Sequence, residues 1–221
     1  RSTDLTRFFE EYLLRDADER MVRRYLGVCH DVCHAEVMFE TQKEVLDLYR
    51  STGIEVGKVQ VSSAIRLKLD SLNHSERESA LQQLAEAHEP RYLHQTLHQL
   101  ADSEPTFYEN LPEALEQIRG NATDRGEIRA HFHVPVYLER FGLLEASQSA
   151  ILECLPLCQE MGVTHFEVET YTWGVLPSEL QMPNLAAGIA QEMLWLQETL
   201  ASSLTQEDSS QSDVERTGQS K

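Results

Sequence analysis

The chain has 221 residues, 41% of them hydrophobic, and its 37 Asp and Glu residues against 19 Lys and Arg residues give a formal net charge of −18. This apolar fraction is large enough for a folded core and excludes wholesale disorder, whereas the absence of any run of about 18 apolar residues excludes a membrane-spanning helix. The acidic balance also argues against a nucleic-acid partner, because like charges repel a phosphate backbone.

The spacing of apolar residues predicts an alternation of helices and strands. In chain order the predicted elements are a helix over 4–15, a strand over 24–29, a helix over 36–52, a strand over 56–61, a helix over 75–87, a loop with a short hairpin over 90–110, a helix over 112–120, a strand over 127–134, a helix over 147–161, a strand over 164–170 and a helix over 184–203. Residues 1–204 form one predicted domain, and the polar segment 205–221 is predicted to be a disordered tail.

Strands followed by helices are typical of a parallel sheet with crossover helices. An open doubly wound sheet and one half of an eight-stranded barrel both fit this order. No Gly-x-Gly-x-x-Gly motif follows a strand, and the sequence has no phosphate-binding loop with Gly-Lys-Ser/Thr, which disfavours the nucleotide-binding open sheet. We therefore expect an α/β fold of the parallel barrel type.

In each predicted strand the side chains alternate between an apolar face, which would meet helices, and a polar face. Ala130, Phe132 and Val134, for example, share the apolar face of the third strand. The polar faces carry Lys58, Gln60 and Ser62 in the second strand, Arg129, His131 and His133 in the third, and His165, Glu167 and Glu169 in the fourth. Buried polar groups need partners, so a metal ion or a polar ligand is expected among them.

Four polar residues fall at strand ends: Asp31, Gln60, His133 and Glu169. Active sites of parallel barrels lie at the carboxyl ends of strands, and carboxylate and imidazole ligands there suit a divalent ion, Zn or Mn.

Each residue also has a purely structural interpretation. Asp31 can cap a helix, His131 and His133 can form a hydrogen-bonded layer, and the glutamates can pair with Arg129 and Lys58. His94 is a further site candidate.

The four cysteines form two pairs, Cys29/Cys33 and Cys154/Cys158, each with three intervening residues. This is neither the redox spacing Cys-x-x-Cys nor a dense disulfide framework. The pattern favours reduced thiols and a cytoplasmic protein.

The run Cys-His-Asp-Val-Cys-His at 29–34, which ends in Asp-x-x-His, resembles the fifth-strand motif of xylose isomerase-like barrels. These include sugar isomerases, ketose 3-epimerases and endonuclease IV. The resemblance implies that Asp31 binds metal, that His34 binds metal or substrate, and that Arg66 binds substrate. Gln60 stands where the epimerases have a metal-binding His.

A narrower resemblance is to the EboE family of metabolite traffic proteins. It rests on the segments 29–40, 93–96, 131–136 and 167–177. It implies that the chain is the carboxyl-terminal half of a barrel, strands five to eight, and that it handles a small metabolite, with other proteins of Ebo gene clusters in bacteria as partners. His94 and Trp173 lie in these segments and are expected to contact the substrate.

Two functions follow as hypotheses. One is a metal-dependent isomerase or epimerase, in which Asp31, His133 and Glu169, with His34, Gln60 and His131 as further candidates, hold the metal. In that enzyme Glu167 transfers the proton, or Glu167 and Glu169 exchange the roles of proton carrier and ligand, and His34 and Arg66 hold the substrate. The other is a metabolite-binding or transport accessory protein without turnover, which the Gln at position 60 favours. Hydrolysis of abasic DNA, as in endonuclease IV, fits the motif but not the charge.

Overall fold

The computed structural model describes residues 1–15, 17–101, 103–121, 125–170, 176 and 180–217, with side chains as far as residue 203. The helices of this part are α1 (Ser2–Phe8), which continues into a π-helical turn (Phe9–Leu13), α2 (Glu19–Tyr25), α3 (Val32–Val37), α4 (Gln42–Thr52), a short 3₁₀ helix (Leu69–Ser71), α5 (His74–Glu86), α6 (Leu111–Gly120), α7 (Gln148–Glu160) and α8 (Leu185–Thr217). The strands are β1 (Val28–Asp31), β2 (Val56–Val61), β3 (Ile65–Lys68), β4 (Thr96–Gln99), β5 (Thr106–Tyr108), β6 (Glu127–Ala130), β7 (Arg140–Phe141), β8 (Leu144–Ala146) and β9 (Phe166–Val168). No helix of the described residues combines the length and the apolar character that crossing a membrane requires.

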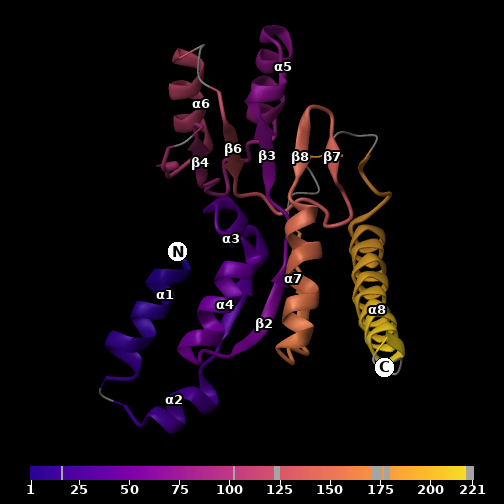
Figure 1. Cartoon of the computed structure of the whole chain (residues 1–221). Coiled ribbons are helices and arrows are strands. Elements are labelled where there is room, and N and C mark those ends of the chain that lie inside the picture. Colours follow the sequence, from indigo (N-terminus) through magenta and orange to yellow (C-terminus); the bar gives the residue numbers. More distant parts are fainter. Residues whose placement is uncertain (16, 102, 122–124, 171–175, 177–179, 218–221) are drawn as a thin grey trace.

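A three-stranded parallel sheet has the order β1-β2-β9. Its register places Asp31 beside Gln60 and Gln60 beside Glu167. The apolar side chains of these strands pack against α4, α7 and α8 in one core (Figure 1). Val59 and Val61 of β2 are fully buried there. Along the other face of the sheet lie the polar residues of the same strands, as the alternation predicts.

The second sheet has six strands in the order β5-β4-β6-β3-β8-β7, and all its pairings are antiparallel. Helices α5 and α6 contribute to the core of this sheet (Figure 1). Phe132 and Val134, which follow β6, are fully buried in the same core. A small cluster of Cys33, Val37, Ala64 and Leu97 combines residues of α3 and β4 with the link between β2 and β3.

The predicted parallel barrel of the xylose isomerase-like TIM type, and hence its carboxyl-terminal half, is wrong. The predicted strand 127–134 is regular only over β6, which pairs antiparallel with β3 and β4 and therefore cannot join β1, β2 and β9. Residues 62–64 separate β2 from β3, and β3 pairs with β6 and β8 instead of extending the parallel sheet. The residue alternation is the same in parallel and antiparallel strands, so it did not reveal that β3 and β6 belong to a separate antiparallel sheet.

Most predicted helices are present with shifted ends. The predicted helix 36–52 is divided into α3 and α4, and the chain between them includes Phe39 with a positive φ of 58°. The predicted strand 24–29 starts later because α2, capped by the Asp18 side chain at the Arg20 N–H, runs to Tyr25. The hairpin expected within 90–110 is present as β4 and β5. The division at residue 204, with a disordered tail beyond it, stays a prediction.

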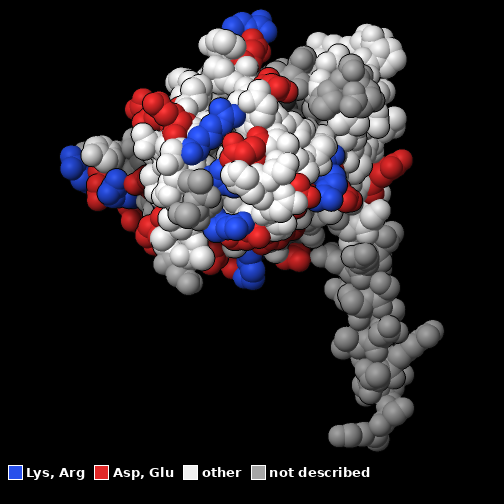
Figure 2. Space-filling model, turned by 90° about the horizontal axis from the view of Figure 1, so that it is seen from above, with Lys and Arg blue, Asp and Glu red and all other residues white. Residues whose placement is uncertain are grey.

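Charged side chains of both signs are interspersed on the surface that Figure 2 shows. In the antiparallel sheet, for example, Glu145 forms ion pairs with Lys68 (2.8 Å) and Arg140 (3.5 Å). Each such partly exposed pair contributes at most about 1 kcal/mol to the free energy of unfolding.

Candidate metal centre

Three segments meet at the carboxyl-terminal edge of the parallel sheet. Asp31 ends β1, and Glu169 follows β9 directly, where its N–H donates to the Val61 carbonyl (3.1 Å). The third segment continues from β6, carries His131 and His133, and is held by the bond from the Val134 N–H to the Ser63 carbonyl (3.0 Å). The two sheets therefore bring together residues that lie far apart in the sequence.

Asp31, His133 and Glu169 each offer one ligand atom, and these atoms all lie within 4.8 Å of one another. His133 Nδ1 is 3.4 Å from Glu169 Oε2, and His133 Nε2 is 4.0 Å from Asp31 Oδ2. The His133 side chain is only 3% exposed, whereas Glu169 is 41% exposed and opens the group to solvent. Two carboxylates and an imidazole form a donor set that suits a divalent ion.

The two carboxylate oxygens of Asp31 have different surroundings. Oδ1 accepts hydrogen bonds from the His34 N–H (3.2 Å), which caps α3, and from the Ser62 hydroxyl (2.7 Å). Oδ2 faces the imidazoles of His34 (3.7 Å) and His133. The capping interpretation and the ligand interpretation of Asp31 are therefore compatible, because capping fixes one oxygen and orients the other.

His34 and His131 extend the group toward solvent. Their ring centroids are 4.5 Å apart, and the His131 and His133 centroids are 4.8 Å apart. The His34 side chain is 55% exposed, so it lies at the rim. A ligand that reaches the metal centre from this side would contact His34 first.

Burial controls the protonation of the inner histidines. It lowers the pKa of His133 to about 4 and, together with the nearby His34 and His133, that of His131 to about 3. Burial also raises the pKa of Glu169, and the negative charges of Asp31 and Glu167 raise it further. Both imidazoles are thus neutral at pH 7, as metal ligands must be, and a cation would relieve the repulsion between the carboxylates.

Gln60 and Glu167 lie on the same polar face but have partners of their own. The Gln60 amide oxygen accepts a weak bond from Cys29 Sγ (3.5 Å) and neighbours Asp31 in the register. Glu167 is 57% exposed and ion-paired with Lys58, whose pKa this bond raises. The predicted proton-transfer group is therefore engaged with a lysine.

Arg66 takes part in a buried ionic network. Its Nε donates to Glu127 (2.7 Å), and its Nη1 lies 3.4 Å from Glu36 Oε1. Arg129 contacts the same two glutamates, at 2.9 and 3.0 Å. The guanidinium predicted to bind substrate is thus paired with carboxylates of β6 and α3.

His94 is fully buried and bonded at both ring nitrogens. Its Nε2 accepts from the Glu89 N–H (3.2 Å), so Nδ1 carries the proton and donates to the His131 carbonyl (2.9 Å). The ring stacks on Phe132 with centroids 3.9 Å apart. His94 therefore positions the segment that carries the histidines, and Trp173 lies outside the described residues.

Sequence reasoning did not assign roles to two residues that hold the centre together, Ser62 and Glu192. Ser62 joins α3 to Asp31, because its hydroxyl also accepts the Cys33 N–H (3.0 Å). Glu192 of α8 is fully buried, and one of its oxygens accepts from the Val136 N–H (3.0 Å) and the Thr170 hydroxyl (2.5 Å). Ser62 lay on the polar face of its predicted strand, and Glu192 lay within the predicted helix 184–203, where no pattern in the sequence distinguished it.

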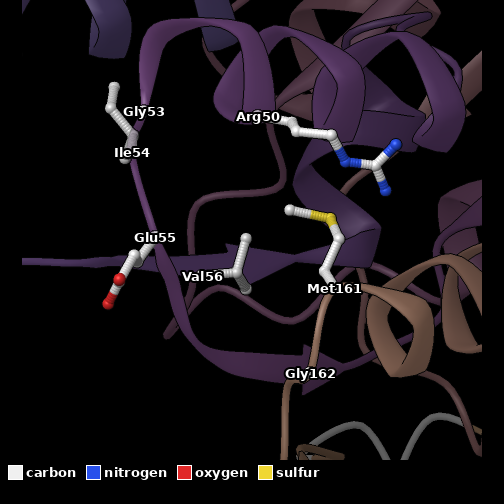
Figure 3. A pocket seen from close by; sticks show the side chains of 7 residues that line it. All are labelled: Arg50, Gly53, Ile54, Glu55, Val56, Met161 and Gly162. Carbon is white, nitrogen blue, oxygen red and sulfur yellow. The ribbon is translucent and has the colours of Figure 1, made fainter.

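A separate hollow of about 490 Å³ lies near the amino-terminal ends of β2 and β9 (Figure 3). Figure 3 shows Arg50, Glu55, Val56 and Met161 around it. Arg50 pairs with Asp47 (3.6 Å). None of the residues that line it is a His or Cys, so it offers no comparable set of metal ligands.

No family model, curated protein or solved structure matches the chain. The geometry of its own residues therefore carries the functional argument.

Proposed function

We propose that the chain binds a divalent metal ion through Asp31, His133 and Glu169 and uses this centre to hold a small hydroxy-carbonyl metabolite. The observation that carries the proposal is the convergence of these three side chains, from three separate segments, within 4.8 Å. The chemistry of the donor set supports a divalent ion, and the neutral state of His133 supports binding at neutral pH.

A bound ion would supply a Lewis acid for the carbonyl and hydroxyl oxygens of the metabolite. The chain does the rest. Ser62 and the His34 N–H fix the orientation of Asp31, and Glu192 holds Val136 and Thr170, which lie close in sequence to His133 and Glu169. His34 at the rim offers an imidazole to a ligand hydroxyl. The resemblance to the EboE family supports a small metabolite as the ligand, a bacterial cytoplasmic setting and partners from the same gene cluster.

Manganese binding to the metal-free chain tests the proposal. We expect Asp31→Asn and Glu169→Gln each to weaken Mn²⁺ binding by about 100-fold or more in calorimetry, since loss of an outer-shell partner alone costs 10–100-fold. Glu198→Gln, on an exposed position of α8, should leave binding unchanged. Aldoses and ketoses should then bind only to the Mn²⁺-loaded chain. A wild-type chain without Mn²⁺ affinity, or equal affinity in all variants, would contradict the proposal.

Proton transfer next to the carbonyl, as in an isomerase or epimerase, is a second candidate. The exposed His34 beside Asp31 favours it, whereas the pairing of Glu167 with Lys58 favours binding without turnover. We expect a catalytic centre to exchange the α-proton of a bound sugar for deuterium in D₂O, at a rate that His34→Gln lowers by about 100-fold. If proton NMR finds no exchange in any sugar that binds to the Mn²⁺-loaded chain, the catalytic candidate is contradicted and only the binding function remains.

A further inference from the structure

A second set of ligand atoms adjoins the first. Cys33, His131 and His133 also offer one ligand atom each within 4.8 Å of one another. His133 belongs to both sets, but the other members differ in chemistry: Asp31 and Glu169 supply carboxylate oxygens, whereas Cys33 and His131 supply sulfur and nitrogen.

The Cys33 thiol is built into this position. The residue is fully buried in α3, its N–H donates to Ser62 Oγ (3.0 Å), and its Sγ donates to the Phe132 carbonyl (3.3 Å). Phe132 lies between the two histidines in the sequence, so the thiol contacts the very segment that carries them. Cys33 forms no disulfide in the structure.

Sulfur and imidazole nitrogen favour borderline and soft ions such as Zn²⁺ and Co²⁺, whereas carboxylate oxygens suit hard ions such as Mn²⁺. We propose that Cys33, His131 and His133 form a second ion position, specific for Zn²⁺-like ions, beside the Mn²⁺-type position at Asp31, His133 and Glu169. This inference rests on the proposed metal centre and deepens it. Zn²⁺ binding releases the Cys33 thiol proton to solvent and leaves a thiolate on the ion.

The shared imidazole makes the two positions alternatives. A neutral imidazole binds one ion through one nitrogen, so His133 serves either the sulfur-containing set or the carboxylate set. The chain should therefore hold one ion at a time, with Zn²⁺ displacing Mn²⁺. With Mn²⁺ bound, Asp31 and Glu169 would be metal ligands. With Zn²⁺ bound, the same two carboxylates would instead be available to contact the metabolite.

Separate Zn²⁺ and Mn²⁺ titrations of the metal-free full chain test this. Zn²⁺ binds most sites more tightly than Mn²⁺, so the informative quantity is the change that each substitution causes for each ion. We expect Cys33→Ser and His131→Gln to weaken Zn²⁺ binding by about tenfold or more and to change Mn²⁺ binding less than about twofold. Asp31→Asn should do the reverse, and Cys29→Ser, a nearby exposed thiol, should change neither.

Cobalt provides an independent readout of the sulfur ligand. The Co²⁺-loaded chain should show a near-ultraviolet thiolate-to-cobalt charge-transfer band, present in Cys29→Ser and absent in Cys33→Ser. If Cys33→Ser does not fold by circular dichroism, His131→Gln serves as the test, because it leaves the thiol in place. Co²⁺ binding that requires Asp31 but produces no such band overturns this inference and leaves the proposed function standing. A chain that binds none of the three ions overturns both.

Discussion

Replacing Glu36 with Met is expected to lower the free energy of unfolding by about 3–5 kcal/mol, because it leaves a buried positive charge uncompensated. Glu36 is 8% exposed and lies between Arg66 (3.4 Å) and Arg129 (3.0 Å), and Glu127 is the fourth member of the network. Burial raises the pKa of Glu36 against the effect of both arginines. Burial acts in the same direction on Glu127, but the hydrogen bond from Arg66 and the charge of Arg129 hold its pKa below the usual value. Urea denaturation at pH 7 measures the loss.

A double variant separates charge imbalance from simple loss of contacts. In Glu36→Met/Arg129→Met the remaining Arg66 and Glu127 form a balanced pair at 2.7 Å, so the double variant should be more stable than Glu36→Met alone. Exposed Glu198→Ala should cost less than about 0.5 kcal/mol. Additive destabilisation in the double variant would contradict this account and assign the loss to packing, including the contact of Arg129 with the Phe39 ring (3.9 Å).

The network also bears on the metal centre. Glu36 belongs to α3, the short helix that begins directly after Asp31, whereas Arg66 and Arg129 belong to β3 and β6 of the antiparallel sheet. The four side chains thus connect the two sheets next to the place where His131 and His133 meet Asp31. Arg66, which sequence reasoning assigned to substrate binding, is instead part of this network between the two sheets.

The fold could be predicted from the sequence only in part, because apolar periodicity identifies an element but not its pairing. The core positions were correct: Ala130, Phe132 and Val134 are all fully buried, although the last two lie beyond the end of β6. The direction of the strands was not. It depends on how the strands pair, since β3 and β6 pair antiparallel in a separate sheet, and the alternation of side chains does not encode pairing direction.

The candidate ligands were easier to identify than the fold because they depend on local position. Asp31 and Glu169 were singled out as residues at strand ends, and both do lie at the same edge of a parallel sheet. His133 reaches them from the other sheet, by a route that the predicted barrel did not include. Cys33 was not singled out, because in a sequence a buried thiol is indistinguishable from a small core residue.

Acidification is expected to destabilise the metal-free chain through His133. Its pKa is about 4 in the folded chain against an ordinary value of 6.5, so only the unfolded chain takes up this proton between these values. The contribution of neutral His133 to stability is therefore fully present above pH 6.5 and is lost as the pH falls to about 4. A difference of this size corresponds to about 3 kcal/mol at pH 4. Urea denaturation between pH 7 and pH 4, with a chelator present, measures it.

Two variants and one ligand make this pH dependence specific. His133→Gln should show a smaller loss of stability over the same pH range, whereas His74→Gln, at an exposed position, should match the wild type. Saturating Mn²⁺ or Zn²⁺ should steepen the wild-type dependence, because the ion binds only the neutral imidazole and stabilises the folded chain most at high pH. If His133→Gln and wild type lose stability in parallel, His133 is charged or solvated in the folded chain. It would then be unfit to serve as the ligand common to both ion positions.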